Sequence, residues 1–183
     1  MHVPDGFINA SVSAATGVIS FGTLWAYIRS ASSLIADKFI ALTGMMTALI
    51  FVLQMINFPV AAGTSGHLLG GALAVIVLGP RLGLICLSVV VIIQSLLFAD
   101  GGLSALGINV MNMAIVTSVT AWVVVKYWIK FIGKTSSSLI IVSVLSGIVS
   151  VVFSSIAFMV QYILGGTISV SYTHLTLPTS RSV

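Results

Sequence analysis

Long apolar stretches alternate with short polar ones along most of the chain. About 20 consecutive apolar residues are enough for a helix to cross a membrane. The recurrence of such stretches predicts an all-α, polytopic transmembrane helix bundle with six spans. The predicted spans are Ala10–Ile28, Lys38–Ile56, Leu68–Leu78, Leu82–Ala99, Ile108–Trp128 and Leu139–Leu164.

The third stretch, Leu68–Leu78, is too short to cross a bilayer unaided. We expect it either to begin earlier, near Gly63, or to lie partly re-entrant against other parts of the protein. A re-entrant segment packed on protein keeps its unpaired backbone groups away from lipid.

Composition agrees with a membrane protein, because 58% of the residues are hydrophobic and only 5% are charged. Soluble domains carry about 25% charged residues. The seven basic residues are scattered, which argues against nucleic-acid binding, since phosphate contacts need clustered cations. The single cysteine, Cys86, lies in an apolar stretch and is interpreted as a small buried hydrophobe.

Basic residues predict the orientation of the bundle, because Lys and Arg gather in cytoplasmic loops. With the N-terminus outside, every basic residue before the last polar stretch is cytoplasmic, namely Arg29, Lys38, Arg81, Lys126, Lys130 and Lys134. The N-terminus and the loops Asn57–Gly66 and Asp100–Gly107 then share the outer face.

Few side chains are available for catalysis. Before residue 170 the chain holds two histidines and three acids and has no glutamate. We find no carboxylate pair for acid–base chemistry, no Ser-His-Asp set and no phosphate-binding GxxxxGK[ST] loop. The sequence therefore predicts a protein that is not an enzyme and does not itself hydrolyse ATP.

A histidine in second position has a chelating geometry that interior histidines lack. The amine of Met1, the amide nitrogen of His2 and its Nδ1 can close on one metal ion, nearly in one plane because the peptide is planar. A fourth nitrogen completes a square plane, which suits Ni(II) or Cu(II), whereas imidazole in general also suits zinc and iron. His67 is the other histidine on the outer face, so Met1, His2 and His67 are the candidate metal ligands. The alternative is that both histidines are incidental.

The residues after His2 are expected to direct it inward. Pro4-Asp5-Gly6 favours a reverse turn, which leaves Phe7 to pack below it. The first seven residues lack the basic and apolar regions of a signal peptide, so we expect the amine to belong to Met1.

Polar residues near the outer face allow two interpretations. Asp100, Asn109 and Asn112 are possible partners that orient the imidazoles from behind. Asn109 and Asn112 are one helical turn apart and are expected to face the same way. The alternative is that the asparagines form interhelical hydrogen bonds that hold the bundle together, and Gln54 and Gln94 carry the same ambiguity.

Residues Val170–Val183 break the apolar pattern and resemble the translation of a sequencing adapter. We predict that they are a non-native tail and that the transmembrane domain is residues 1–169, with an N-terminal metal-binding segment at 1–9. A natural polar tail is the alternative.

Three separated motifs resemble the CbiM/NikM family, the substrate-specific membrane components of energy-coupling-factor transporters for cobalt and nickel. They are MHVPDGF at the start, TSGHLLGGALA followed by GPR, and QSLLFADGGLSALGINVMNMA from Gln94 to Ala114. The resemblance implies a helix bundle whose N-terminal tip inserts from outside. It also implies an ion held by the Met1 amine, the amide and Nδ1 nitrogens of His2, and His67.

The resemblance further implies location in a prokaryotic cell membrane and several partners. These are a transmembrane scaffold protein, a small auxiliary membrane subunit and cytoplasmic ATPase subunits. A cobalt or nickel ion would be the cargo, with no organic cofactor, and a further helix is expected after Leu164. Two other functions stay open: uptake of an organic micronutrient, and a non-transporting membrane scaffold.

Overall fold

The computed structural model describes residues 2–31, 37–59 and 65–167 and is almost entirely helical there. The helices are α1 (Ala10–Ala31), α2 (Asp37–Met55), α3 (Gly71–Leu97), α4 (Leu106–Asn109), the π-helix η3 (Val110–Val116), α5 (Thr117–Ile132) and α6 (Ser136–Gly165). Two short strands, β1 (Phe58–Pro59) and β2 (Ser65–Gly66), pair in antiparallel fashion. The predicted all-α bundle is confirmed.

Four of the described helical segments are long and apolar enough to cross a membrane. They are Ala10–Ala31, Gly71–Leu97, Leu106–Ile132 and Ser136–Gly165, and the apolar part of α2, Phe39–Met55, is shorter. Many large apolar side chains on their outer surfaces are exposed, as is expected of surfaces that face lipid. The chain is therefore a membrane protein.

The third and fourth predicted spans correspond to the two helical arms of α3, which are divided at Gly79 as the sequence predicted. Gly79 interrupts the helix with φ 80° and ψ 171°, and Pro80 follows it. A Cβ atom on Gly83 would lie 2.9 Å from the Ala74 carbonyl carbon, so the two arms pack closely on each other. The first arm begins at Gly71, after both of the starts that the sequence suggested. The number of membrane crossings stays a prediction.

The core of the bundle lies where α3 packs against its neighbours. α3 contacts α1, α2, α5, α6 and η3. The largest buried apolar side chains at these contacts are Ile50, Leu84, Leu87, Val90, Val91 and Met113. This packing places both arms of α3 at the centre and leaves the polar loops at the two ends.

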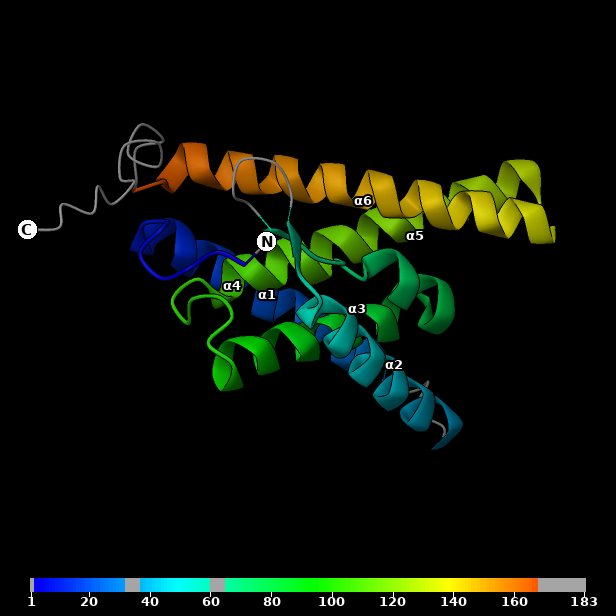
Figure 1. The fold of residues 1–183 in the computed structure, drawn as a ribbon, viewed down its shortest axis with the longest axis horizontal. Coiled ribbons are helices and arrows are strands. Elements are labelled where there is room, and N and C mark those ends of the chain that lie inside the picture. The colour runs from blue at the N-terminus through cyan, green and yellow to red at the C-terminus, as the bar shows by residue number, and fades with distance from the viewer. Residues whose placement is uncertain (1, 32–36, 60–64, 168–183) are drawn as a thin grey trace, which may run out of the picture.

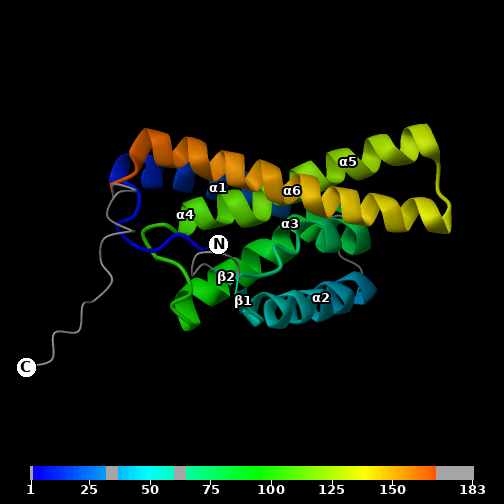
Figure 2. The same cartoon turned by 45° about the horizontal axis from the view of Figure 1, so that its top comes forward.

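The N-terminal segment, the loop after α3 and the C-terminal end of α6 lie together at the left end of the molecule in Figures 1 and 2. The connection between α5 and α6 lies at the opposite end. The Arg81 Nη1 atom donates a hydrogen bond to the Ser30 carbonyl oxygen at 3.4 Å, close to the end of α1. The N-terminal segment and the loop after α3, which were predicted to share the outer face, therefore share one end of the bundle.

Residues 2–9 form a segment that we call the N-terminal strap. Its predicted turn is confirmed, because the Phe7 amide donates to the Pro4 carbonyl oxygen at 3.4 Å and Gly6 adopts φ 76°. Phe7 packs against Phe158 and Tyr162 of α6, with ring centres 6.2 and 5.4 Å away.

The far end of the strap is tied to the end of α6 through the backbone. The Asn9 amide donates to the Gly165 carbonyl oxygen at 2.7 Å, and the Thr167 amide donates to the Phe7 carbonyl oxygen at 3.2 Å. The Thr167 hydroxyl also donates to the Gly6 carbonyl oxygen. The C-terminal end of the strap is thus held by the end of α6.

Candidate metal-binding site

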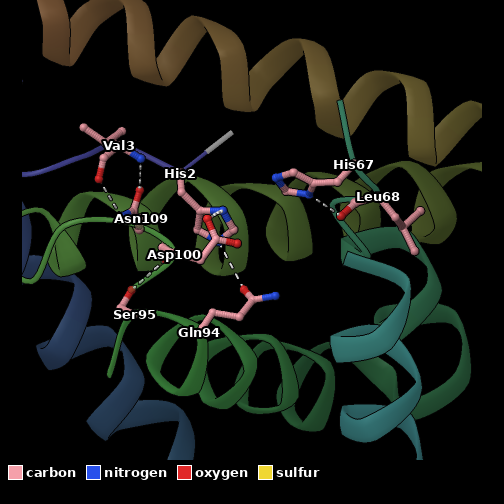
Figure 3. Close-up of polar contacts among 8 residues, drawn as sticks. All are labelled: His2, Val3, His67, Leu68, Gln94, Ser95, Asp100 and Asn109. Carbon is pink, nitrogen blue, oxygen red and sulfur yellow. Dashed lines mark hydrogen bonds and ion pairs between the residues drawn. The ribbon is translucent and has the colours of Figure 1, made fainter. Parts of the chain in front are cut away.

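The two histidines singled out from the sequence lie side by side. The ring centres of His2 and His67 are 5.2 Å apart, with 23° between their planes, and Figure 3 shows both rings above α3. With metal–nitrogen bonds of about 2 Å, two imidazoles on one ion have ring centres roughly 4.5 to 6.5 Å apart. The spacing therefore fits a shared ion.

His67 is oriented by its own neighbour in the chain. Its Nδ1 atom lies 2.9 Å from the Leu68 carbonyl oxygen. A carbonyl oxygen only accepts, so Nδ1 carries the proton and Nε2 is the nitrogen able to bind a metal. The next residue is fixed as well, because the Gln54 Nε2 atom donates to the Leu69 carbonyl oxygen at 2.8 Å. The His67 ring extends toward His2 in Figure 3.

Both ring nitrogens of His2 face oxygen atoms. Nδ1 lies 3.1 Å from the Asp100 Oδ1 atom, and Nε2 lies 3.1 Å from the Gln94 Oε1 atom. Gln94 is on α3, and Asp100 is in the loop that follows α3 (Figure 3). Of the polar residues considered from the sequence, these two contact the His2 ring.

Burial controls the charge of both imidazoles. Desolvation lowers the pKa of His2, although the negative charge of Asp100 opposes the shift. Desolvation also lowers the pKa of His67, against the opposing hydrogen bond to Leu68. Both rings are therefore neutral near pH 7, which is the state that binds metal.

Asn109, at the end of α4, holds the backbone of the strap. Its Oδ1 atom accepts from the Val3 amide at 2.8 Å, and its Nδ2 atom donates to the Val3 carbonyl oxygen at 3.1 Å. The Gly102 amide donates to the same carbonyl oxygen at 2.9 Å. Asn109 therefore positions the residue after His2 instead of contacting an imidazole.

Two glycines let the loop after α3 approach the strap. A Cβ atom on Gly101, which has φ +97°, would lie 2.8 Å from the Asn109 Nδ2 atom and 3.2 Å from the His2 Cβ atom. A Cβ atom on Gly102 would overlap the backbone nitrogen of Asp5. A side chain at either position would displace the strap from its contacts with this loop.

Asp5 anchors the exposed side of the strap to the same loop. Its Oδ1 atom accepts from the Ser104 backbone amide at 2.7 Å and from the Ser104 hydroxyl at 2.6 Å. Both hydrogen bonds favour the carboxylate and lower the pKa of Asp5. Together with Asn109 and Gly102, which contact Val3, this contact fixes the strap at the turn and just before it.

Asn112 does not orient either imidazole. Its Nδ2 atom donates to the Gln161 Oε1 atom at 2.7 Å, and its Oδ1 atom accepts from the Gln161 Nε2 atom at 3.0 Å. Asn112 lies in the π-helix η3, which begins at Val110, and the wider turn of a π-helix departs from the spacing assumed for the two asparagines. The interhelical interpretation describes Asn112, and the expectation that Asn109 and Asn112 face one way stays a prediction.

The remaining predicted ligand, Met1, lies outside the described residues, so its place in the site stays a prediction. Within the described ranges, no group of three or more His, Cys, Asp or Glu side chains is arranged to hold a metal ion. The side chains placed here thus supply two imidazole nitrogens, and further donors would come from the chain terminus and backbone.

Sequence reasoning left the role of Gln94 open and did not single out Gly102 or Ser104. The QSLLFADGG stretch places Gln94 six residues before Asp100. The spacing predicts that the side chains of Gln94 and Asp100 lie close together only if α3 is known to end at Leu97.

Comparisons with known proteins agree with this description. A family model described as a cobalt uptake substrate-specific transmembrane region matches residues 2–180. A putative fused nickel transport protein of Archaeoglobus fulgidus is 47% identical over 63% of this chain and 38% of its own length. A cobalt transport protein of Geobacter sulfurreducens is 32% identical over 68% of this chain and 37% of its own.

A solved structure described as a truncated transition metal transporter has a similar fold. It matches with a TM-score of 0.77 at 26% identity, over 88% of this chain and 73% of that one. The chain spans well under two thirds of the length of the two curated relatives.

Proposed function

The chain belongs to the CbiM family of cobalt uptake substrate-specific transmembrane proteins, and we propose that it captures Co(II) or Ni(II) at the outer face of a prokaryotic membrane. The observation that carries the proposal is the pair of imidazoles, with ring centres 5.2 Å apart, at the end of the bundle that holds the strap. The nickel and cobalt transport names of its relatives support the same cargo.

Four nitrogens would hold the ion. The amine of Met1, the amide nitrogen of His2 and its Nδ1 form two fused chelate rings, and the His67 Nε2 atom completes the plane. Such a nitrogen plane suits Ni(II). The contacts that hold residues 3–9 would then fix the position of the chain terminus relative to the ion.

Asp100 would balance the charge of the loaded site. A divalent ion bound to one deprotonated amide nitrogen and three neutral nitrogens keeps a net charge of about +1. The Asp100 carboxylate, 3.1 Å from the His2 Nδ1 atom, offsets that charge where the surroundings are poor in water. In the absence of the ion, the same carboxylate lies beside Nδ1 of His2, the nitrogen that would bind the ion.

The transport step would require other subunits. We propose that a transmembrane scaffold protein, a small auxiliary subunit and cytoplasmic ATPase subunits drive inward release, as in energy-coupling-factor transporters. The chain itself would be a transport component and not an enzyme, with its N-terminus outside.

The test acetylates the amine of Met1, which removes one proposed donor nitrogen while keeping every side chain. We expect purified wild-type protein with a native terminus to bind one Co(II) or Ni(II) per chain by calorimetry, and the acetylated protein to bind neither. Equal binding by both proteins would contradict the proposal. It would favour the organic-micronutrient or scaffold alternatives, for which the first amine is irrelevant.

A further inference from the structure

Gln94 is a buried polar residue whose side-chain hydrogen-bonding groups are only partly satisfied by the described residues. Its side chain has 0% exposed surface, and its Oε1 atom lies 3.1 Å from the His2 Nε2 atom. Its own Nε2 amide group is buried with no hydrogen-bond partner among the residues that the structure describes. A buried unpaired donor is costly, so an apolar side chain would serve better if Gln94 only filled space.

The His2 ring has one proton and two oxygen neighbours to share it. A neutral imidazole donates from only one of its nitrogens, yet Nδ1 faces Asp100 and Nε2 faces Gln94. If Nδ1 carries the proton, it donates to Asp100 and no metal can bind there. If Nε2 carries the proton, it donates to Gln94 and Nδ1 presents its lone pair.

The two ends of a carboxamide allow Gln94 to pair with either form of the ring. With Oε1 toward His2, as in Figure 3, it accepts from a protonated Nε2 atom. Turned over, its amide group donates to an unprotonated Nε2 atom, and the unpaired buried group becomes an oxygen. Asp100 can pair only with the Nδ1–H form, and a glutamate at position 94 could pair only with the Nε2–H form.

We propose that Gln94 is the positioning residue that selects Nδ1 of His2 as the metal-binding nitrogen and lets the ring return to its metal-free form. The proposal rests on the function proposed above. When the metal ion binds, the ring proton lies on Nε2, which donates a hydrogen bond to Gln94. When the ion is released, the proton returns to Nδ1, which donates a hydrogen bond to Asp100. A glutamine thus combines capture with release, which a permanently accepting side chain would hinder.

The test compares Gln94→Met and Gln94→Glu with the control Gln161→Met. Gln161 is a buried glutamine that pairs with Asn112 and not with an imidazole. We expect Gln94→Met to lower Ni(II) affinity by about 10- to 100-fold, the usual effect of losing a partner behind a metal ligand. Gln94→Glu should retain or raise affinity and slow dissociation, and Gln161→Met should leave affinity unchanged.

A second measurement does not depend on metal binding. Nitrogen-15 NMR of histidine-labelled, metal-free protein reports which His2 nitrogen carries the proton. We expect Gln94→Glu to shift the ring toward Nε2–H and Gln94→Met to shift it toward Nδ1–H, with Gln161→Met like wild type.

The two measurements separate the possible failures. If wild type binds no metal but the proton shifts as stated, the proposed function fails and the control of His2 by Gln94 stands. If the proton stays where it is in wild type in both folded Gln94 variants, or if Gln94→Met and Gln94→Glu change affinity alike, the proposal for Gln94 is overturned.

Discussion

His2 and His67 meet in one site, yet they are held in opposite ways. His67 is fixed by its own neighbour, through the Leu68 carbonyl oxygen, on a segment that follows β2. His2 is fixed by residues far away in the chain, with Gln94 and Asp100 on its ring and Asn109 on the adjoining backbone.

This difference indicates a division of labour between the two histidines. Met1 and the strap together would supply three of the four nitrogens, and the strap is held by the loop after α3, α4 and the end of α6. His67 would supply one nitrogen from a locally fixed ring. Damage on the strap side should therefore abolish the site, whereas damage at His67 should weaken it.

The largest expected effect is that of pH, and it comes mainly from the strap. Metal binding displaces the protons of the amine and of the His2 amide. Below the amine reference pKa of about 7.7, each unit of acidification should thus lower affinity about 100-fold. The pKa values of His2 and His67 lie below their ordinary value, so the imidazoles add to the slope only in more acidic solution.

Calorimetry from pH 8 to 5.5 measures this slope. The hydrogen bonds from Ser104 lower the pKa of Asp5, so Asp5 stays ionised and the strap stays anchored over this range. The His67→Ala variant is expected to keep the same slope near neutral pH. Affinity independent of pH in wild type would exclude the amine and the amide as ligands.

Replacing each histidine in turn is the next largest effect. His2→Ala removes the six-membered chelate ring together with the support for amide deprotonation, so we expect no measurable binding of Ni(II). His67→Ala leaves the Met1 amine and the two His2 nitrogens, so we expect one ion per chain at an affinity lowered by more than about 100-fold, which exceeds the loss of an outer contact. Equal losses of affinity and stoichiometry in the two variants would contradict the division of labour.

A substitution at Gly102 tests the contact between the strap and the loop after α3 without changing a proposed metal ligand. In Gly102→Ala the added Cβ atom overlaps the Asp5 backbone, so the strap must shift. We expect Ni(II) affinity to fall by about 10- to 100-fold. Gly22→Ala is the matched control, because a Cβ atom there meets nothing within 4 Å, and wild-type affinity in Gly102→Ala would show that this contact does not control binding.

The smallest effect separates Asn109 from Asn112. Asn109→Ala leaves the Val3 amide buried without its acceptor, which should lower the free energy of unfolding by about 1–3 kcal/mol and metal affinity by about 10-fold. Asn112→Ala removes only its pairing with Gln161, so it should lower stability alone. Thermal unfolding and calorimetry on both variants distinguish these outcomes, and a loss of affinity in Asn112→Ala would reverse the assignment.

The helical fold, the shared end of the N-terminal segment and the loop after α3, and the meeting of His2 with His67 could be predicted from the sequence. Apolar length gave the helices, the placement of basic residues grouped these two polar segments, and Pro4-Asp5-Gly6 gave the turn. These features depend on local composition or on a rule that applies to the whole chain.

The rest depends on geometry that local patterns do not encode. Asn109 contacts Val3 of the strap, whereas Asn112, in the π-helix, pairs with Gln161 of α6. The pairing of the strap with Gly165 and Thr167 joins residues from opposite ends of the described chain. Nothing near Asn9 in the sequence signals that contact.

The central claim is that the first nitrogens of the chain and two imidazoles hold one ion. The most direct measurement is X-ray absorption spectroscopy of Ni(II)-loaded protein with its native terminus. We expect four nitrogen ligands in a plane, two of them imidazoles, and the loss of one imidazole signal in His67→Ala. A six-coordinate, oxygen-rich ion, or a spectrum that the His67→Ala substitution leaves unchanged, would contradict the account.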